Sequence, residues 1–426
     1  MVLKKLILYF IFFSFVLSKT IHASRILDYE TEVFIDDILN EIKLVNNIER
    51  DIKFIILADE KINAFVDQNN IIYITSGLIE NCEDYVAFLS VIAHEVGHIH
   101  NNHITQRKLS MSKVKNINTV SNLSIIVGSM MANNPQILQG LSVSSASVSE
   151  FYINFTKNQE READYYAMKT LSELNLYSNS IIKLLNTIEQ RGIERGLSKN
   201  EMRLSTHPYF EERIDIVNYL KKKSNPSYNY LTNENFKFIQ AKFIGYSENS
   251  KRLAKINQPY NIYSQSIIDA KRGNLKNSLE NLNYLISTND DNIYLIETKG
   301  EILFSYGYIN EAIKFYKLVL NKLPNNRYAQ IRIFENTNFE ELSSKDADKL
   351  FYENLNILEK YYNNKNILLT YLKLSTYLKK DEWIIFLNYW LNKNLDRNDI
   401  VKNLDNFMDT NDKYLLKLIK LMYNNI

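Results

Sequence analysis

The stretch VIAHEVGHIHNNH, residues 91–103, constrains the fold of this chain more than any other part of the sequence. It holds four of the six histidines of the 426-residue chain, set among apolar residues at helical spacing. His94 and His98 are four residues apart, so a helix places both imidazoles on one face, where they can bind one Zn²⁺ ion. Glu95 lies beside them and is suited to act as a general base. The stretch therefore predicts half of a metal site on a buried helix.

A later segment, QEREAD, offers the missing half, because two histidines alone do not complete a catalytic zinc site. Glu160 and Asp164 share a helix face, so one can bind the metal while the other holds a ligand imidazole. Glu162 is a competing choice that lies off this face, and an ordinary charged helix surface is the alternative for the whole segment. We expect His100 and His103 to be structural or surface residues.

The charge and cysteine content exclude several classes of protein. The 51 basic and 49 acidic residues nearly balance, which argues against a nucleic-acid-binding protein. The single cysteine, Cys82, excludes an intramolecular disulfide and a cysteine-rich zinc site, and we expect it to be a small buried side chain. Any metal must therefore be held by His, Asp or Glu.

Residues 1–24 have the features of a signal peptide. Lys4 and Lys5 precede the apolar run LILYFIFFSFVL at 6–17, and small residues follow it. The run is shorter than the about 20 residues that span a bilayer, and an uncleaved membrane anchor is the alternative. We expect a protein that is exported from the cytoplasm and has at most peripheral membrane contact.

Residues 25–235 are predicted to form an α+β domain, mostly helical with a small sheet. Residues 52–58 are β-like, and residues 63–77 are typical of a hairpin whose returning strand is IIYIT. We expect this returning strand to be a sheet edge, which could take up an added strand from a bound molecule. The substrate-binding residues predicted there are Ile72, Tyr73 and Ile74.

Three further segments carry expectations about the organisation of the chain. Asn81 is expected to cap the helix that contains His94, with Asp84 completing the cap. Residues 117–149, rich in small residues, suit a mobile lid, a membrane-leaning hairpin or plain helical packing. Residues 236–259 are predicted to contain a linker helix.

The C-terminal region, residues 260–426, contains a repeat with a period of 34 residues. Gly273 and Gly307 are 34 apart, and so are Ser278 and Ala312. This period, with paired helices, is typical of tetratricopeptide repeats. Two units are marginal for a solenoid, so we expect the later helices to extend or cap it. The region is predicted to be an all-α tetratricopeptide-repeat solenoid that offers a concave surface to a protein partner.

The segments NAF, IIYITSGL, AHEVGHIHNNH, QEREAD and STHPYFEERI together resemble the HtpX/BepA branch of the gluzincin metallopeptidases. The signal peptide and the repeats make the chain similar to the periplasmic BepA-type proteases. The resemblance implies a gluzincin peptidase domain that binds one zinc ion per chain through His94, His98 and Glu160. It also implies that Glu95 is the general base and that Asp164 orients a ligand histidine.

Two residues of STHPYFEERI acquire roles from the same resemblance. His207 matches a family histidine that either stabilises the tetrahedral intermediate or blocks the open site. Arg213 matches a family arginine, either as a catalytic residue or as a salt-bridge partner that supports the site. One departure from the family lies just before Glu160, where this chain has NFTKNQE instead of the family's usual SR. The resemblance therefore does not predict the local lid contacts, although the ligands match.

The function implied by the resemblance is that of a periplasmic zinc endopeptidase. It would hydrolyse peptide bonds of misfolded or stalled proteins in outer-membrane protein quality control and assembly. Its implied partners are unfolded or misassembled protein substrates and, on the repeat surface, a protein such as the outer-membrane assembly machinery. One alternative is a repeat-based scaffold or chaperone with a self-inhibited or inactive peptidase domain. Another is a general secreted endopeptidase.

Overall fold

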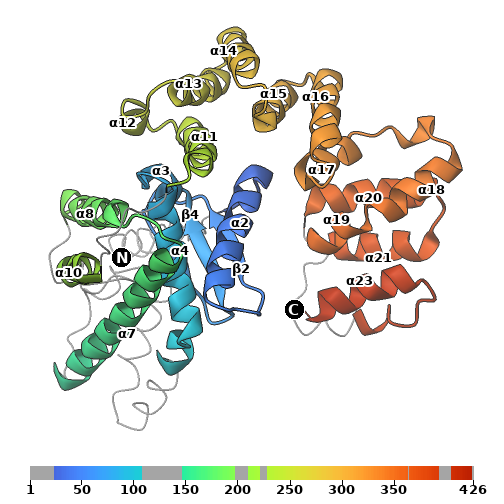
Figure 1. The fold of residues 1–426 in the computed structure, drawn as a ribbon. Helices are drawn as coiled ribbons and strands as arrows, with labels where there is room; N and C mark the ends of the chain where they lie inside the picture. Colours follow the sequence, from blue (N-terminus) through green and yellow to red (C-terminus); the bar gives the residue numbers. More distant parts are fainter. Residues whose placement is uncertain are drawn as a thin grey trace, which may run out of the picture. The chain divides into compact units, whose positions relative to one another are not determined.

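The computed structural model describes six stretches of the chain, residues 24–107, 146–196, 210–220, 228–362, 364–392 and 404–424. The chain divides into two compact units, Met1–Gly273 and Asn274–Ile426, whose elements Figure 1 labels. None of the helices in the described stretches is both long and apolar enough to span a membrane. Nearly all of the predicted signal peptide and of the small-residue stretch at 117–149 lies outside the described residues.

The first unit contains a small mixed sheet with the strand order β1-β2-β4-β3. Strands β2 and β4 are parallel, and the other two pairs are antiparallel. The predicted hairpin is confirmed, because β3 and β4 pair with Ala64 opposite Ile74. The Asp67 carboxylate closes its turn by accepting the backbone N–H groups of Asn69 and Ile71, both at 2.9 Å. The strands are β1 (Arg25–Ile26), β2 (Lys53–Leu57), β3 (Ala64–Val66) and β4 (Ile71–Thr75).

The expectation that IIYIT is a sheet edge is wrong. Strand β4 pairs with β2 on one side and with β3 on the other, so the outer strand beside it is β3. Ile72 and Ile74 are fully buried, and Tyr73 is half-buried with its ring stacked on Phe65. The hairpin pattern predicts only the partner that β4 reaches through the turn, and it gives no sign of the parallel partner β2 from further upstream.

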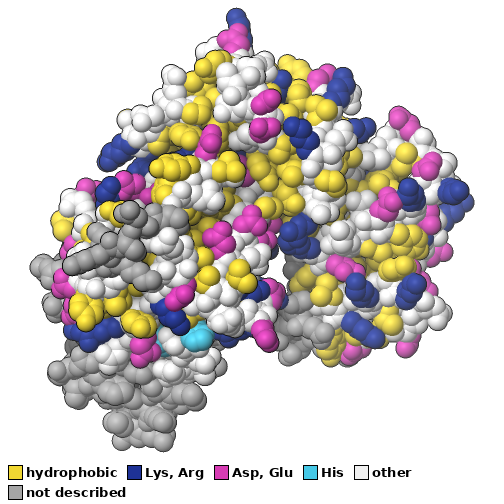
Figure 2. Space-filling model, in the orientation of Figure 1, with side chains coloured by type: hydrophobic (Ala, Val, Ile, Leu, Met, Phe, Trp, Pro, Cys, Tyr) yellow, Lys and Arg dark blue, Asp and Glu magenta, His cyan; other side chains and the backbone are white. Residues whose placement is uncertain are grey.

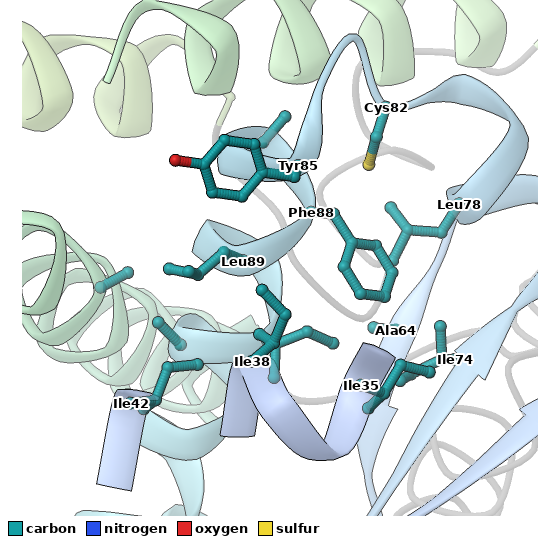
Figure 3. Close-up of a cluster of buried hydrophobic side chains, with 14 of the residues drawn as sticks. Ile35, Ile38, Ile42, Ala64, Ile74, Leu78, Cys82, Tyr85, Phe88 and Leu89 are labelled. Carbon is teal, nitrogen blue, oxygen red and sulfur yellow. The ribbon is translucent and has the colours of Figure 1, made fainter. Parts of the chain in front are cut away.

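Two helices cover the core beside this sheet, α2 (Tyr29–Val45) and α4 (Tyr85–His100). Figure 3 shows the isoleucines of α2 near Phe88 and Leu89 of α4, with Cys82 drawn above Leu78 in the same cluster. Cys82 is fully buried, as expected. The helix that carries His94 is capped by Asp84, which accepts the N–H of Ala87 at 2.9 Å. Asn81 instead ends the short helix α3 (Ser76–Asn81), because Cys82 adopts an extended backbone.

The segment predicted as a linker helix is a core element of the first unit. Helix α11 (Tyr230–Ser247) buries Phe236, Ile239 and Phe243 in the same cluster as α2 and α4. Gln240 ties it to the end of α3 by donating to the carbonyls of Ile79, Glu80 and Cys82 at 2.7–3.2 Å. The limits predicted for the domains, at residues 235 and 260, stay predictions. The remaining helices of this unit are α7 (Ala146–Glu173), α8 (Asn179–Glu194), α10 (Phe210–Leu220), α12 (Ser250–Leu253) and α13 (Tyr260–Lys271).

The second unit is helical throughout its described residues, which confirms the all-helical C-terminal region. Its core is rich in aromatic side chains, including Phe351, Trp383 and Phe386. Its elements are α14 (Leu275–Thr288), α15 (Ile293–Ser305), α16 (Ile309–Lys322), α17 (Arg327–Glu335), η2 (Phe339–Glu341), α18 (Ser344–Glu353), α19 (Leu355–Lys360), α20 (Lys365–Tyr377), α21 (Asp381–Leu391) and α23 (Lys413–Asn424).

The positions predicted to repeat every 34 residues share local structure. Gly273 and Gly307 both follow a helix and both have a positive φ, 86° and 83° respectively. Ser278 and Ala312, the paired small residues, are both fully buried in the helix that follows. These features agree with a repeated helical hairpin, and the assignment to tetratricopeptide repeats stays a prediction.

Candidate metal centre

The candidate site lies where α4 and α7 run side by side (Figure 1). Gly97 permits their close approach, because a Cβ atom there would lie only 3.0 Å from Tyr166 Cβ and 3.2 Å from Ala163 Cα. Two histidines of α4 flank Gly97, three residues before it and one after it. Glu160 and Asp164 flank Ala163 at the same spacings on α7. The contact therefore brings both predicted halves of the site together.

Three side chains form a group that could hold a metal ion, namely His94, His98 and Glu160. The Nε2 atoms of the two histidines lie 3.1 Å apart. The Glu160 carboxylate faces both, with Oε2 at 3.3 Å from His94 Nε2 and Oε1 at 3.4 Å from His98 Nε2. All three residues are at most 4% exposed. The face drawn in Figure 2 shows only a small area of histidine surface, in keeping with this burial.

A buried ion pair lies behind His94. Asp164 Oδ1 is 2.8 Å from His94 Nδ1, and Arg213 Nη2 contacts the same oxygen at 2.8 Å. Burial would raise the pKa of Asp164, but Arg213 and His94 lower it below its usual value. Burial and Arg213 oppose protonation of His94, yet Asp164 and Glu160 raise its pKa to about 9. Asp164 thus holds the His94 imidazole. Of the two roles expected for Arg213, catalytic residue or salt-bridge partner, the structure shows the salt bridge.

A second chain of contacts lies behind His98. His103 Nδ1 is 2.8 Å from His98 Nδ1, and His103 Nε2 is 2.9 Å from Glu162 Oε2. Asn102 has a positive φ of 54°, which turns the chain after α4 and brings His103 back towards the helix. Burial lowers the pKa of His103, although Glu162 opposes the shift. Of the two positions expected for these histidines, His103 therefore has the structural one, since it is fully buried, whereas His100 is exposed.

Residues after α4 also contact Glu160. Arg107 Nη2 lies 3.5 Å from Glu160 Oε1, and Arg107 Nε donates to Gln159 Oε1 at 2.5 Å. Gln159 Nε2 in turn donates to the backbone carbonyl of His103 at 3.3 Å. These contacts fix the carboxylate of Glu160 against the end of α4.

The other predicted site residues are placed as follows. Glu95 follows His94 on α4 and is 1% exposed. Its carboxylate is near enough to contribute, with Asp164 and Glu160, to raising the pKa of Arg213 against the effect of burial. His207 lies outside the described residues.

Sequence reasoning missed four residues around the site, His103, Glu162, Arg107 and Gln159. Of these, the sequence offered Glu162 as a competing metal ligand and His103 as a structural or surface residue, and neither was expected to support His98. Helical spacing could not place His103 because the left-handed residue Asn102 separates it from α4. The one available signal was chemical, since two further histidines follow the predicted ligands in the first segment and a second glutamate follows Glu160 in the other.

Comparison with known proteins agrees with this geometry. Residues 35–221 match the sequence profile of Peptidase family M48. A putative beta-barrel assembly-enhancing protease of Vibrio cholerae is 26% identical over 203 residues, which cover 45% of this chain and 40% of that protein. The beta-barrel assembly-enhancing protease of Escherichia coli is 22% identical over 335 residues, which cover 75% of this chain and 66% of that protein.

The beta-barrel assembly-enhancing protease of Yersinia pestis is 22% identical over 201 residues, 47% of this chain and 40% of its own length. The matched part therefore spans less than two thirds of each of these relatives. The family match includes all of α4 and α7, so it contains His94, His98 and Glu160. Residues 35–221 thus match Peptidase family M48, and the chain is similar to the beta-barrel assembly-enhancing proteases.

Proposed function

We propose that the first unit is a zinc endopeptidase that binds one zinc ion per chain through His94, His98 and Glu160. The observation that carries this proposal is the spacing of the ligand atoms. Two ligands of a tetrahedral zinc ion, each about 2.0–2.1 Å from the metal, lie about 3.3–3.4 Å apart. The two Nε2 atoms lie 3.1 Å apart, and each faces a different oxygen of Glu160, Oε2 at 3.3 Å from His94 and Oε1 at 3.4 Å from His98. With one ligand atom taken from each residue, the three atoms lie within 4.8 Å of one another. Two imidazoles and one carboxylate also form a ligand set of catalytic zinc sites, which leave one position open.

The chemistry that zinc supplies when bound by such a set is Lewis-acid activation of water and of a substrate carbonyl. Glu95 accepts the proton of the attacking water in this proposal, because it adjoins His94 on the same buried helix. Asp164 and Arg213 keep the His94 imidazole in place. His207 stabilises the tetrahedral intermediate or closes the site, as the family resemblance implies. Arg213 therefore acts as a positioning residue here rather than as a catalytic one.

We propose an extended peptide as the substrate, bound as an added strand. The outer strand β3 replaces β4 as the candidate edge, since β4 already has neighbours on both sides. The role of Ile72, Tyr73 and Ile74 would then be to position β3 from within the sheet. Strand β3 also contacts α4, the helix that carries two of the metal ligands.

The biological role that we propose is quality control and assembly of outer-membrane proteins in the periplasm. The names of the relatives, beta-barrel assembly-enhancing proteases, support this proposal. Unfolded or misassembled proteins would be the substrates. The helical second unit would bind a protein partner, such as the outer-membrane assembly machinery, through tetratricopeptide repeats.

The test compares the full-length wild type with Glu95→Gln in zinc content and in cleavage of an unfolded outer-membrane barrel protein. We expect one bound zinc ion in both proteins. Cleavage should be about 10²–10⁴-fold slower in the variant, which lacks the general base. Glu173→Gln serves as the control because it makes the same substitution at an exposed glutamate of α7, and it should cleave like the wild type.

Bound zinc without Glu95-dependent cleavage would contradict the peptidase proposal and support a repeat-based scaffold with an inactive or self-inhibited domain. A folded barrel protein serves as the second substrate. Equal cleavage of folded and unfolded barrels would contradict the proposed preference for misassembled proteins, while leaving the zinc chemistry intact.

A further inference from the structure

The two histidines of the metal centre are supported in different ways. His94 Nδ1 contacts the Asp164 carboxylate directly, at 2.8 Å. His98 Nδ1 contacts a second imidazole, that of His103, at 2.8 Å, and only this second imidazole reaches a carboxylate, that of Glu162. Both Nε2 atoms point to Glu160. Each ligand histidine is therefore connected on its far side to a carboxylate of α7.

The hydrogen-bond pattern behind His98 fixes the proton positions in sequence. An ionised carboxylate only accepts hydrogen bonds, so Glu162 requires a proton on His103 Nε2. A neutral His103 then carries a lone pair on Nδ1 and accepts from His98. His98 consequently bears its proton on Nδ1, which leaves the lone pair of its Nε2 directed at Glu160 and at the place of the metal.

We propose that His103 and Glu162 act together as positioning residues, holding His98 in the tautomer and orientation that bind the metal. This inference rests on the proposed zinc site and deepens it. Neither residue touches the metal or the substrate. Their effect is transmitted through the His98 imidazole, as that of Asp164 is transmitted through His94.

The arrangement of α7 supports this role. Glu160, Glu162 and Asp164 occupy alternate positions of one helix, and each contacts a different part of the centre. Glu160 contacts the metal-facing nitrogens, and the other two lie behind the two histidines. The His103 imidazole is fully buried, while the side chain of Glu162 is 60% exposed. A change of Glu162 therefore tests the contact with little risk to folding.

The experiment measures the zinc affinity of the full-length protein by competition with a chromophoric chelator. His103→Leu and Glu162→Ala are each expected to weaken zinc binding about 10–100-fold, the usual range for residues that support metal ligands. His103→Asn should recover most of the affinity, because its side-chain oxygen can accept the proton of His98 Nδ1. Glu173→Ala, on an exposed part of the same helix, serves as the matched control and should bind zinc like the wild type.

The outcomes separate this inference from the zinc site on which it rests. Failure of the wild type to bind zinc would overturn both. Tight binding by the wild type, together with unchanged affinity in Glu162→Ala, would overturn the positioning role alone. If His103→Leu binds as tightly as His103→Asn, His103 serves only to fill space, and that result also overturns the proposal. Circular dichroism of each variant verifies that the compared proteins are folded.

Discussion

The two units of the molecule bury different kinds of side chain. The first unit encloses ionisable groups at the metal centre and, away from it, Lys242. Among the described residues of the second unit, Glu297 is the only charged side chain that is buried, and the core combines aliphatic residues with many aromatic ones such as Trp383. A buried charge is costly unless it is paired, whereas a buried aromatic ring stabilises by removing apolar area from water. The second unit is thus stabilised chiefly by packing, and the first also depends on matched charges.

The cluster around Lys242 shows that matched charges need not belong to a catalytic site. Lys242 Nζ, on α11, lies 2.8 Å from Asp28 Oδ1 and 2.5 Å from Glu30 Oε2, at the start of α2. Burial raises the pKa of Glu30 to about 7, whereas Lys242 and Thr31 lower the pKa of Asp28 against the effect of burial. One lysine faces two carboxylates, so Asp28, which also caps α2, keeps its charge more readily.

Removing Lys242 is the strongest way to disturb the charge balance of the first unit. Lys242→Met leaves two carboxylates without their cation and should lower the free energy of unfolding of this unit by about 3–5 kcal/mol. Urea unfolding, followed by circular dichroism, measures the loss. The exposed lysine Lys251 supplies the control, since Lys251→Met should change stability by at most about 0.5 kcal/mol. An equal effect of both substitutions would contradict the importance of the buried charges.

The corresponding change in the second unit removes packing rather than charge. The ring of Trp383 meets Phe351 edge-on at 5.0 Å, and its Nε1 donates to Asp412 Oδ2 at 2.7 Å. Trp383→Ala should destabilise this unit by about 3–5 kcal/mol. Trp383→Phe keeps most of the ring and should cost less. Zinc affinity should stay unchanged in both variants, and a parallel loss of zinc binding would break the distinction between the two units.

A smaller effect is expected where the two helices of the metal centre touch. Gly97→Ala introduces a methyl group 3.0 Å from Tyr166 Cβ, so α4 and α7 must separate slightly. Such overpacking costs about 1–3 kcal/mol. Zinc affinity should fall together with stability, because the ligands come from both helices. The control is Gly196→Ala, where nothing lies within 4 Å of the added atom, although the positive φ of 78° adds local strain. Zinc binding that weakens equally in both variants would contradict the proposed role of the contact.

The parts of the site that follow helical spacing could be predicted from the sequence. His94 and His98, and likewise Glu160 and Asp164, are four residues apart, and each pair shares a helix face in the structure. The β3–β4 hairpin was equally predictable because its turn and both strands are local. The parallel pairing of β2 with β4 could not be predicted, because no local sequence pattern indicates which second strand pairs with β4.

The supporting residues were harder to predict because their positions depend on chain reversals. His103 reaches His98 only through the turn at Asn102, and Glu162 contributes through His103 rather than through the metal. Arg213 lies 49 residues after Asp164, so its salt bridge depends on the packing of α10 against α7, and only the family resemblance indicated it. Long-range contacts of this kind carry no periodic signal in the sequence.

The central claim is that α4 and α7 together bind one zinc ion, and metal analysis of the purified full-length chain tests it most directly. Wild-type protein, loaded with zinc and freed of excess metal by gel filtration, should retain one zinc ion per chain. Glu160→Gln removes the charged ligand that α7 supplies and should retain far less zinc under the same conditions. Equal zinc content in the two proteins, or none in the wild type, would contradict the account.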